Sequence, residues 1–337
     1  MNLPDLITRF SGIRALVVGD ICLDRWCHYD PSVAEPSRET GIPRVGVVSV
    51  EVTPGAGGTI ASNLVALGAG RVSVIGAVGQ DGFGFELGCA LAERRIEYNL
   101  LAASKSLQTF TYTKLINAAT GVEDLPRCDF INTRRLPADV ENQLIANFNA
   151  HFQEFDVVLV SDQAETQAGG VVTDWFRDLI ADVAERYPQK VIVADSRARI
   201  ERFRNVMAKP NHKEALAACR RLFGSASGLA PGQTDLQRLR TVIGSRPLLV
   251  TQGDRGVLLV DDGGEHLVPS ENVPNPIDIC GAGDSFAAGM ALALRACGDF
   301  VTAIRFGNLV SSITIMKKGT GTAAPDEILA KASARLN

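Results

Sequence analysis

Short runs of β-branched and other apolar residues recur along the chain, and each ends at a glycine or a polar residue. They lie at residues 15–20, 72–76, 157–162, 191–197 and 248–251. Longer segments with an apolar face lie between or after them, at residues 137–152, 285–297 and 300–316. Uninterrupted apolar runs of this length are typical of strands buried in a parallel sheet. The alternation of such strands with helices predicts an α/β fold, with a doubly wound, mostly parallel sheet flanked by helices.

Two segments interrupt this alternation and predict strands outside the main sheet. The first, at about residues 25–52, contains three prolines, which exclude a continuous helix, and it ends in a β-branched run. The second, at about residues 108–132, places Thr109, Thr111 and Thr113 at alternate positions and contains a turn further on. An alternation with period two is the pattern of a half-buried strand.

Composition and charge narrow the class of protein. The 337 residues are 46% hydrophobic and 21% charged, which allows a large core in one α/β domain or in two smaller ones. A formal net charge of −4 provides no basic field, so we expect neither nucleic acid nor a membrane surface as a partner. The longest apolar stretch is too short to span a bilayer, and no secretory signal is visible. The seven cysteines form no C-x-x-C pair, which predicts reduced thiols in a cytoplasmic protein.

The stretch at residues 275–286 carries the strongest chemical signal. Prolines hold its start extended, and a helix of small residues is predicted to follow it. Gly281, Ala282 and Gly283 therefore stand at the helix N-terminus, where free backbone N–H groups bind an anion without a basic side chain. Asp284 in the first turn is placed to take a proton from a hydroxyl that attacks phosphorus. This combination predicts phosphoryl transfer, and the alternative is a tight glycine turn that only caps the helix.

Two segments near the N-terminus are suited to a polyol. Asp24 follows the first predicted strand, and a carboxylate accepts hydrogen bonds from two hydroxyls at once. Taken alone, Asp24 is better explained as a surface aspartate in a loop. Residues 53–69 predict a glycine-rich helix start, with Gly55 and Thr59 near its beginning, whose backbone a sugar can approach closely. The alternative there is a helix start with a structural role only.

The motif Asp278-x-x-Gly281-Ala282-Gly283-Asp284 resembles the C-terminal signature of the ribokinase, or pfkB-type, carbohydrate kinases. Further matching stretches run from about residue 17 to residue 320. The resemblance implies a ribokinase-like fold, with residues 1–337 as a single kinase domain and segments 25–52 and 108–132 as a small β-lid. It implies a phosphotransferase with an alcohol group as acceptor. Asp284 would be the catalytic base, and the Gly281, Ala282 and Gly283 amides would form the anion hole.

A second motif of the family implies the nucleotide and its metal ion. Asn211 and Glu214 match the family's Asn-x-x-Glu pattern. In relatives the Asn faces the nucleotide phosphates, and the Glu orders the water shell of Mg²⁺, an ion that gives up its waters reluctantly. The resemblance therefore implies ATP and Mg²⁺ as cofactors. The alternative from the residues alone is a helix cap with an exposed glutamate.

Other positions resemble the family's nucleotide and cation regions. Thr251, Gly253 and Gly256 match a Thr-x-Gly-x-x-Gly turn that contacts the nucleotide in relatives. Asn308 lies in a predicted helix that, in relatives, runs beside the adenine. Asp278, at the start of the signature, belongs to the region that binds a monovalent cation such as K⁺ in relatives.

Asp24, Gly55 and Thr59 match the positions that bind the sugar in the family. Two residues depart from the usual pattern: Ala56 replaces a glycine, and Thr59 stands where an asparagine normally contacts the sugar. A threonine still donates and accepts a hydrogen bond, but over a shorter reach. The acceptor is therefore the least defined feature of the resemblance.

Within the family, the resemblance is strongest to the kinase half of the ADP-heptose synthesis enzymes. Residues 18–26 and 37–43 carry it, together with Lys114 and the Arg127-x-Asp129 segment. It implies a sugar or sugar phosphate as acceptor, such as a heptose 7-phosphate, with Arg25, Arg38 and Lys114 available to contact its phosphate. The lid is also the segment through which several relatives form a homodimer.

Two alternatives stay open at this point. One is a nucleoside or ketohexose kinase of the same family. The other is a non-catalytic sugar- or nucleotide-binding homologue, which the presence of Asp284 and of the Gly-Ala-Gly segment disfavours. The absence of Gly-Lys-Ser/Thr excludes a P-loop NTPase, and no Gly-x-Gly-x-x-Gly follows the first strand, which argues against an NAD dehydrogenase.

Overall fold

The central sheet of the computed structural model contains eight strands in the part of the chain that the structure describes, which is residues 2–33, 35–166, 168–224 and 234–334. Its spatial order is β14-β13-β12-β11-β10-β9-β1-β4. From β4 to β12 neighbouring strands are parallel, and β13 and β14 add an antiparallel edge. The strands are β1 Arg14–Gly19, β4 Arg71–Ile75, β9 Val157–Asp162, β10 Val191–Ser196, β11 Met207–Ala208, β12 Leu248–Thr251, β13 Val257–Asp261 and β14 Gly264–Val268. The predicted doubly wound, ribokinase-like sheet is confirmed.

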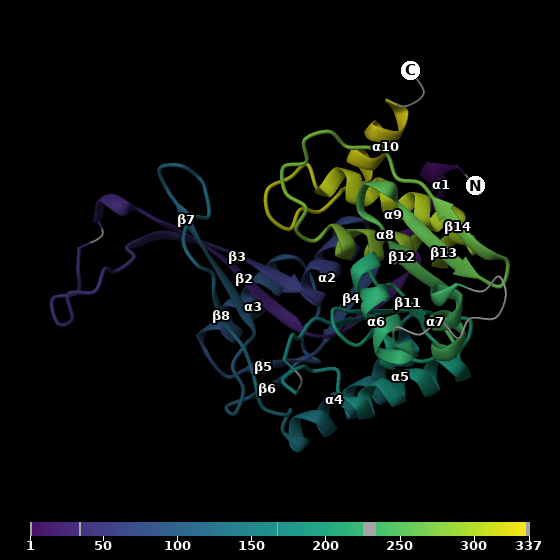
Figure 1. Ribbon diagram of the computed structural model, residues 1–337, viewed down its shortest axis with the longest axis horizontal. Coiled ribbons are helices and arrows are strands. Elements are labelled where there is room, and N and C mark those ends of the chain that lie inside the picture. Colours follow the sequence, from purple (N-terminus) through teal and green to yellow (C-terminus); the bar gives the residue numbers. More distant parts are fainter. Residues whose placement is uncertain (1, 34, 167, 225–233, 335–337) are drawn as a thin grey trace.

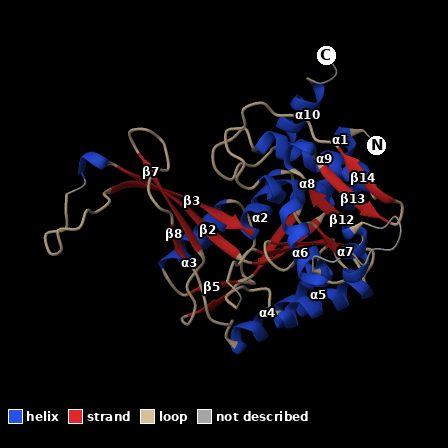
Figure 2. Cartoon of the chain, viewed as in Figure 1, coloured by secondary structure: helices blue, strands red, loops and turns tan. Residues whose placement is uncertain are grey.

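Helices cover both faces of this sheet (Figure 2). Alternate residues of β1 show the division, because Ala15 and Val17 pack into one apolar cluster and Leu16 and Val18 into the other. The first cluster lies under α1 Leu3–Thr8, α2 Gly57–Ala66, α3 Gly82–Glu93, α8 Ala282–Cys297, α9 Phe300–Thr314 and α10 Pro325–Ser333. The second lies under α4 Ala138–His151, α5 Asp174–Arg186, α6 His212–Phe223 and α7 Asp235–Ile243. None of the described helices combines the length and apolarity that a membrane crossing requires.

A second sheet projects from the body as a lid (Figure 1). It has the order β3-β2-β7-β8 and consists of β2 Ile21–Tyr29, β3 Val47–Ala56, β7 Thr111–Asn117 and β8 Cys128–Phe130. These strands come from the two segments that interrupt the alternation in the sequence. β2 follows β1 after a single residue, Asp20, so the chain passes directly from the body into the lid. A short pair, β5 Ala77–Gly79 and β6 Ala102–Ser104, lies beside it.

One predicted helix start moves by a few residues, and another is confirmed. Strand β3 continues through the residues expected to open a helix, and α2 begins only at Gly57. Ala56 makes the change of direction with a positive φ of 51°. Helix α8 begins at Ala282 with Gly281 as its N-cap, in a left-handed conformation with φ 76°, so the helix N-terminus predicted at residues 281–283 is confirmed.

Gly19 stands where β1 approaches β9 too closely for a side chain. Its φ is +129°, and a Cβ built on it would lie 2.1 Å from the Ser161 carbonyl oxygen. We expect Gly19→Ala to lower the free energy of unfolding, measured by denaturant titration, by more than about 2 kcal/mol. Gly12→Ala is the matched control, because no atom lies within 4 Å of its Cβ position, and we expect a change within about 0.5 kcal/mol. Equal effects of both substitutions would contradict the role of Gly19.

Candidate active site

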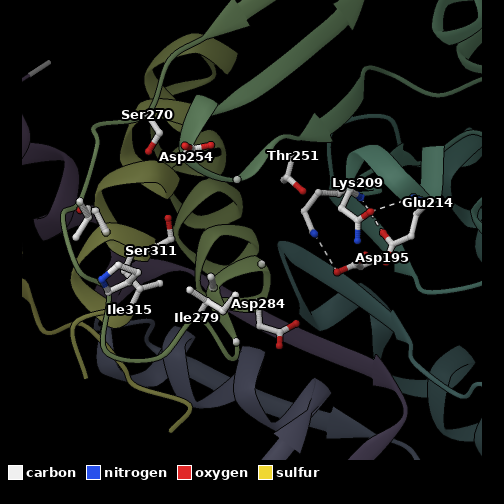
Figure 3. A pocket seen from close by; sticks show the side chains of 18 of the residues that line it. Asp195, Lys209, Glu214, Thr251, Asp254, Ser270, Ile279, Asp284, Ser311 and Ile315 are labelled. Atoms are coloured by element: carbon white, nitrogen blue, oxygen red, sulfur yellow. Dashed lines mark hydrogen bonds and ion pairs between the residues drawn. The ribbon is translucent and has the colours of Figure 1, made fainter. Parts of the chain in front are cut away.

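Polar residues gather where the parallel strands end, because the carboxyl ends of such strands share one edge of the sheet. Gln163 follows β9, Asp195 lies in β10, Lys209 follows β11 and Thr251 ends β12. These side chains line a cavity of about 650 Å³, and the first turn of α8 with Asp284 closes it (Figure 3). The topology therefore brings residues from distant parts of the chain to one site.

The N-terminus of α8 faces this cavity. Gly281, Ala282 and Gly283 line it, as the sequence predicted. The first N–H groups of a helix have no acceptor inside the helix and favour an anion. The Ala282 amide is partly used, since it donates to the Ile279 carbonyl at 3.2 Å. A Cβ at Gly281 would lie 3.1 Å from Thr59 Cγ2, so only glycine keeps this turn tight against α2.

Asp284 lies in an environment that opposes its negative charge. Burial and the nearby Asp195 carboxylate raise the pKa of Asp284 to about 7, although Lys209 acts in the opposite direction. Lys209 is itself buried and forms an ion pair of 2.9 Å with Asp195. A carboxylate with a pKa near neutrality is suited to accept and release a proton at physiological pH.

A smaller cavity of about 170 Å³ adjoins the first under the lid. Gln163, Arg197, Gly281 and Asp284 line both cavities, so Asp284 lies at their junction. Asp284, the predicted base, therefore lies between the two cavities. The larger cavity is at the edge of the central sheet, and the smaller one is under strands β2 and β7 of the lid.

Asp24, Thr59 and Lys114 line the smaller cavity, as predicted from the sequence. Burial raises the pKa of Asp24 to about 6, with Lys114 acting against this. Gly55 lies beside Asp24 on the paired strand, where a Cβ would be 2.5 Å from Asp24 Oδ1, so it makes room for the carboxylate. The Thr59 hydroxyl is buried and donates to the Pro54 carbonyl at 3.3 Å.

Two arginines of the smaller cavity were not among the predicted site residues. Arg127 comes from the lid, stacks over the Tyr112 ring at 5.0 Å and pairs with Asp129 at 2.7 Å. Arg197 follows β10 and pairs with Glu165 at 2.6 Å. The sequence contained a signal for each of them, since Arg197 ends a predicted strand and Arg127 lies in a predicted lid segment.

Five predicted site residues do not line either cavity: Gly55, described above, Asp278, described below, and the three that follow. Arg38 is exposed in the loop between β2 and β3, which extends to the far end of the lid (Figure 1), because that hairpin runs away from the body. Asn308 is buried in α9 and donates to the Pro269 carbonyl at 3.3 Å, while Ser311 one turn later lines the larger cavity. Gly256 shapes the turn between β12 and β13 with a φ of +101° and does not face the cavity that Gly253 and Thr251 line.

Asn211 and Glu214 both line the larger cavity and cap α6 at the same time. The Asn211 side chain accepts the Glu214 N–H at 2.9 Å, and Glu214 Oε2 accepts the Asn211 N–H at 2.7 Å. Burial and Asp195 raise the pKa of Glu214. The described residues hold no preformed group of three or more metal ligands. The pair Glu214 and Asp195 in one cavity still fits Mg²⁺, which usually takes one or two carboxylates and fills its other positions with water and phosphate.

Asp278 has a structural role that the resemblance did not specify. One carboxylate oxygen accepts the Cys280 N–H at 2.9 Å, and the other accepts the Gly319 N–H at 3.1 Å. These bonds tie the segment before α8 to the segment after α9. Binding of a monovalent cation near Asp278 stays a prediction.

This geometry, with the start of helix α8 and the carboxylate Asp284 of raised pKa between two cavities, is suited to the transfer of a phosphoryl group to a hydroxyl. Residues 16–327 match the model of the pfkB family carbohydrate kinases, and the chain belongs to that family.

Known proteins agree with this assignment. The chain is 30% identical over 334 residues to the bifunctional protein HldE of Rhodopseudomonas palustris and 31% identical over 322 residues to that of Nitrobacter winogradskyi. It covers 98% and 95% of its own length in these matches, but only 65% and 64% of the relatives' length. Among solved structures, it is similar to a ribokinase from Thermotoga maritima (TM-score 0.70, 20% identity, 95% of this chain and 99% of that one). It is also similar to phosphofructokinase-2 from Escherichia coli (TM-score 0.72, 19% identity, 96% and 100%).

The charges around Asp284 predict how its pKa responds to substitution. Asp195→Asn removes a repelling charge and leaves Lys209 unpaired, so we expect the pKa of Asp284 to fall by about one pH unit or more. Lys209→Met should raise it. The measurement is an NMR titration of isotopically labelled aspartate carboxyls, with Asp284→Asn to assign the resonance. Asp254→Asn, a carboxylate at the rim of the same cavity, should leave the pKa unchanged. A shift of the same sign in the first two variants would contradict this account.

Proposed function

We propose that this protein is an ATP-dependent sugar kinase that transfers the γ-phosphoryl group to a hydroxyl of a sugar or sugar phosphate. The observation that carries the proposal is the position of Asp284 at the junction of two cavities, beside the start of α8. The larger cavity, about 650 Å³, is of the size that binds a nucleotide, and the smaller one suits a polar acceptor.

In the proposed reaction Asp284 takes the proton of the acceptor hydroxyl. The hydroxyl oxygen forms a bond to the γ-phosphorus while the bond from phosphorus to the β–γ bridging oxygen breaks, and ADP leaves. The α8 amides and the cations Lys209 and Arg197 face the negative charge that accumulates during transfer. The lid over the smaller cavity excludes water, which would otherwise compete as acceptor.

The nucleotide would lie against Asn211, Thr251 and Gly253 in the larger cavity. Glu214 would hold Mg²⁺ through water, and the ion would supply positive charge to the phosphates. The phosphofructokinase-2 structure similar to this chain is a complex with potassium, which supports K⁺ as a cofactor. The position near Asp278 is the one that the resemblance to the family implies.

The acceptor is proposed to carry a phosphate of its own. Arg25, Lys114, Arg127 and Arg197 line the smaller cavity, together with the carboxylate Asp24 proposed to bind hydroxyls. The three arginines form ion pairs with carboxylates outside the lining. Four cations around one small space still exceed what a neutral sugar needs, which favours a sugar phosphate over a nucleoside or a free ketohexose. The resemblance to the kinase half of ADP-heptose synthesis enzymes supports a heptose 7-phosphate.

Assembly and location complete the proposal. β3 is an edge strand of the lid, and its exposed side chains include Val47, Val48 and Val50. An exposed apolar edge strand is a surface that pairs with another chain, which supports a homodimer through the lid. The seven cysteines are free thiols, which supports a cytoplasmic location for the enzyme.

We expect Asp284→Asn to lower kcat by about 10²–10⁴-fold, because an amide cannot take the acceptor proton. ATP binding, measured by calorimetry, should change little, since the amides of the α8 start stay in place. Release of ADP in the presence of a panel of sugars and sugar phosphates measures kcat. Activity within a few-fold of the wild-type value would exclude Asp284 as the base.

Arg127→Ala tests the nature of the acceptor. We expect kcat/KM for a phosphorylated acceptor to fall by about ten- to a hundredfold, because a phosphate left without its cation costs about 1–3 kcal/mol. The value for an unphosphorylated sugar should change by no more than a few-fold. Arg38→Ala is the matched control, since Arg38 is exposed outside the cavity and its loss should affect neither acceptor. Equal losses for both acceptors in Arg127→Ala would overturn the sugar phosphate.

A further inference from the structure

A separate cavity of about 360 Å³ lies on the face of the sheet that α4 and α5 cover. Arg135 before α4, Arg177 in α5, and Arg199 and Arg202 after β10 contribute four guanidinium groups to its wall. It shares no lining residue with the two cavities at Asp284. None of the proposed steps of phosphoryl transfer uses it.

Positive charge exceeds negative charge in this cavity, although the whole chain has a net charge of −4. The carboxylates that line it are Glu141 and Asp174, against the four arginines. Asp174 pairs with Arg177 at 2.5 Å and with Arg202 at 3.4 Å, and its pKa is lowered first of all by the Arg177 hydrogen bond. The buried Asp162 behind the wall pairs with Arg199 at 2.7 Å and with Arg177 at 3.7 Å, so four arginines stand against three carboxylates and an excess of one positive charge stays at the cavity.

The inner arginines are held rigidly. Arg199 donates to both oxygens of the fully buried Asp162, at 2.7 and 3.2 Å, and to the Ala164 and Thr166 carbonyls. Arg177 is 6% exposed and donates to the Val172 carbonyl at 2.6 Å. Its Nε has no hydrogen-bond partner among the described residues. Donors that are fixed before a ligand arrives lose little entropy when it binds.

The outer arginines are available to a ligand. The Arg202 side chain is 56% exposed, and among the described residues it contacts only Asp174, at 3.4 Å. Arg135 is exposed and has no ion pair or hydrogen bond to any of the described residues. Trp175, in the first turn of α5, lies at the same cavity and is 54% exposed. A planar aromatic group beside several guanidinium groups is suited to a ligand with an anionic end and a carbon body.

We propose that this cavity is a binding site for a small phosphate ester, distinct from the nucleotide and acceptor sites. Its phosphate would take hydrogen bonds from Arg135 and Arg202, against the fixed charges of Arg177 and Arg199, and its carbon body would contact Trp175. Arginine is the preferred residue for phosphate because its planar fork matches two phosphate oxygens at once. A volume of about 360 Å³ exceeds a free phosphate and matches an ester of a few carbons.

Trp175 reports on the site directly. The chain has two tryptophans, and the Trp26→Phe variant leaves Trp175 as the only one. We expect saturable fluorescence quenching by glycerol 3-phosphate, with weaker binding of inorganic phosphate and no saturable change with sulfate or chloride at equal ionic strength. The assay measures binding only, so its result does not depend on the proposed kinase activity.

Arg135→Ala combined with Arg202→Ala should weaken glycerol 3-phosphate binding by at least tenfold. Arg134→Ala is the matched control, because Arg134 is the exposed neighbour of Arg135 and does not line the cavity, and binding should stay within twofold. Both mutated arginines are exposed, and a thermal unfolding scan checks that the variants fold. Absence of quenching, equal affinity for sulfate, tighter binding of free phosphate than of the ester, or equal weakening in Arg134→Ala would each overturn the proposal.

Discussion

The buried Asp20 residue connects the parts of this molecule on which the site depends. It stands between β1 of the body and β2 of the lid, and its carboxylate accepts the N–H groups of Gln163, Ala164 and Val171. Its own N–H donates to the Ser161 carbonyl, and its carbonyl accepts the Gly57 N–H at the start of α2. One residue thereby fixes the lid strand, the loop after β9 and the helix that carries Thr59.

Burying the charged Asp20 carboxylate beside a second carboxylate is electrostatically unfavourable. Burial and the neighbouring Asp162 raise the pKa of Asp20 to about 6, and the three N–H groups reduce that effect without cancelling it. The loop that Asp20 holds begins with Gln163, which lines both cavities at Asp284. The position of a wall residue of the active site thus depends on a carboxylate that makes no contact with either cavity. Buried polar groups are retained where they specify one loop conformation, and this loop is such a case.

The local part of the site could be predicted from the sequence. The Gly281–Asp284 turn, Asp24 and the Asn211–Glu214 pair lie within short motifs, and local backbone geometry decides their roles. Arg127, Lys209 and Arg38 could not be placed in the same way. Whether a lid residue faces the smaller cavity depends on the register in which β2 pairs with β7. The direction in which the hairpin with Arg38 leaves the body is likewise not encoded in its own sequence. Lys209 reaches Asp195 because β11 lies next to β10 in the sheet. This strand order cannot be predicted from any local sequence pattern.

The lid and the start of helix α8 meet at residues 319–320. The hydroxyl oxygens of Thr320 and of Thr53 in β3 are 3.4 Å apart. A Cβ at Gly281 would lie 3.4 Å from Thr320 Cγ2. Asp278 ties Gly319 to the segment before α8. A displacement of the lid would therefore act on the same turn that orients the α8 amides and Asp284. In the proposed reaction water must be excluded before the phosphoryl group moves, so a contact that connects the lid to the helix start would link the geometry of the proposed anion site to the closure of the proposed acceptor cavity.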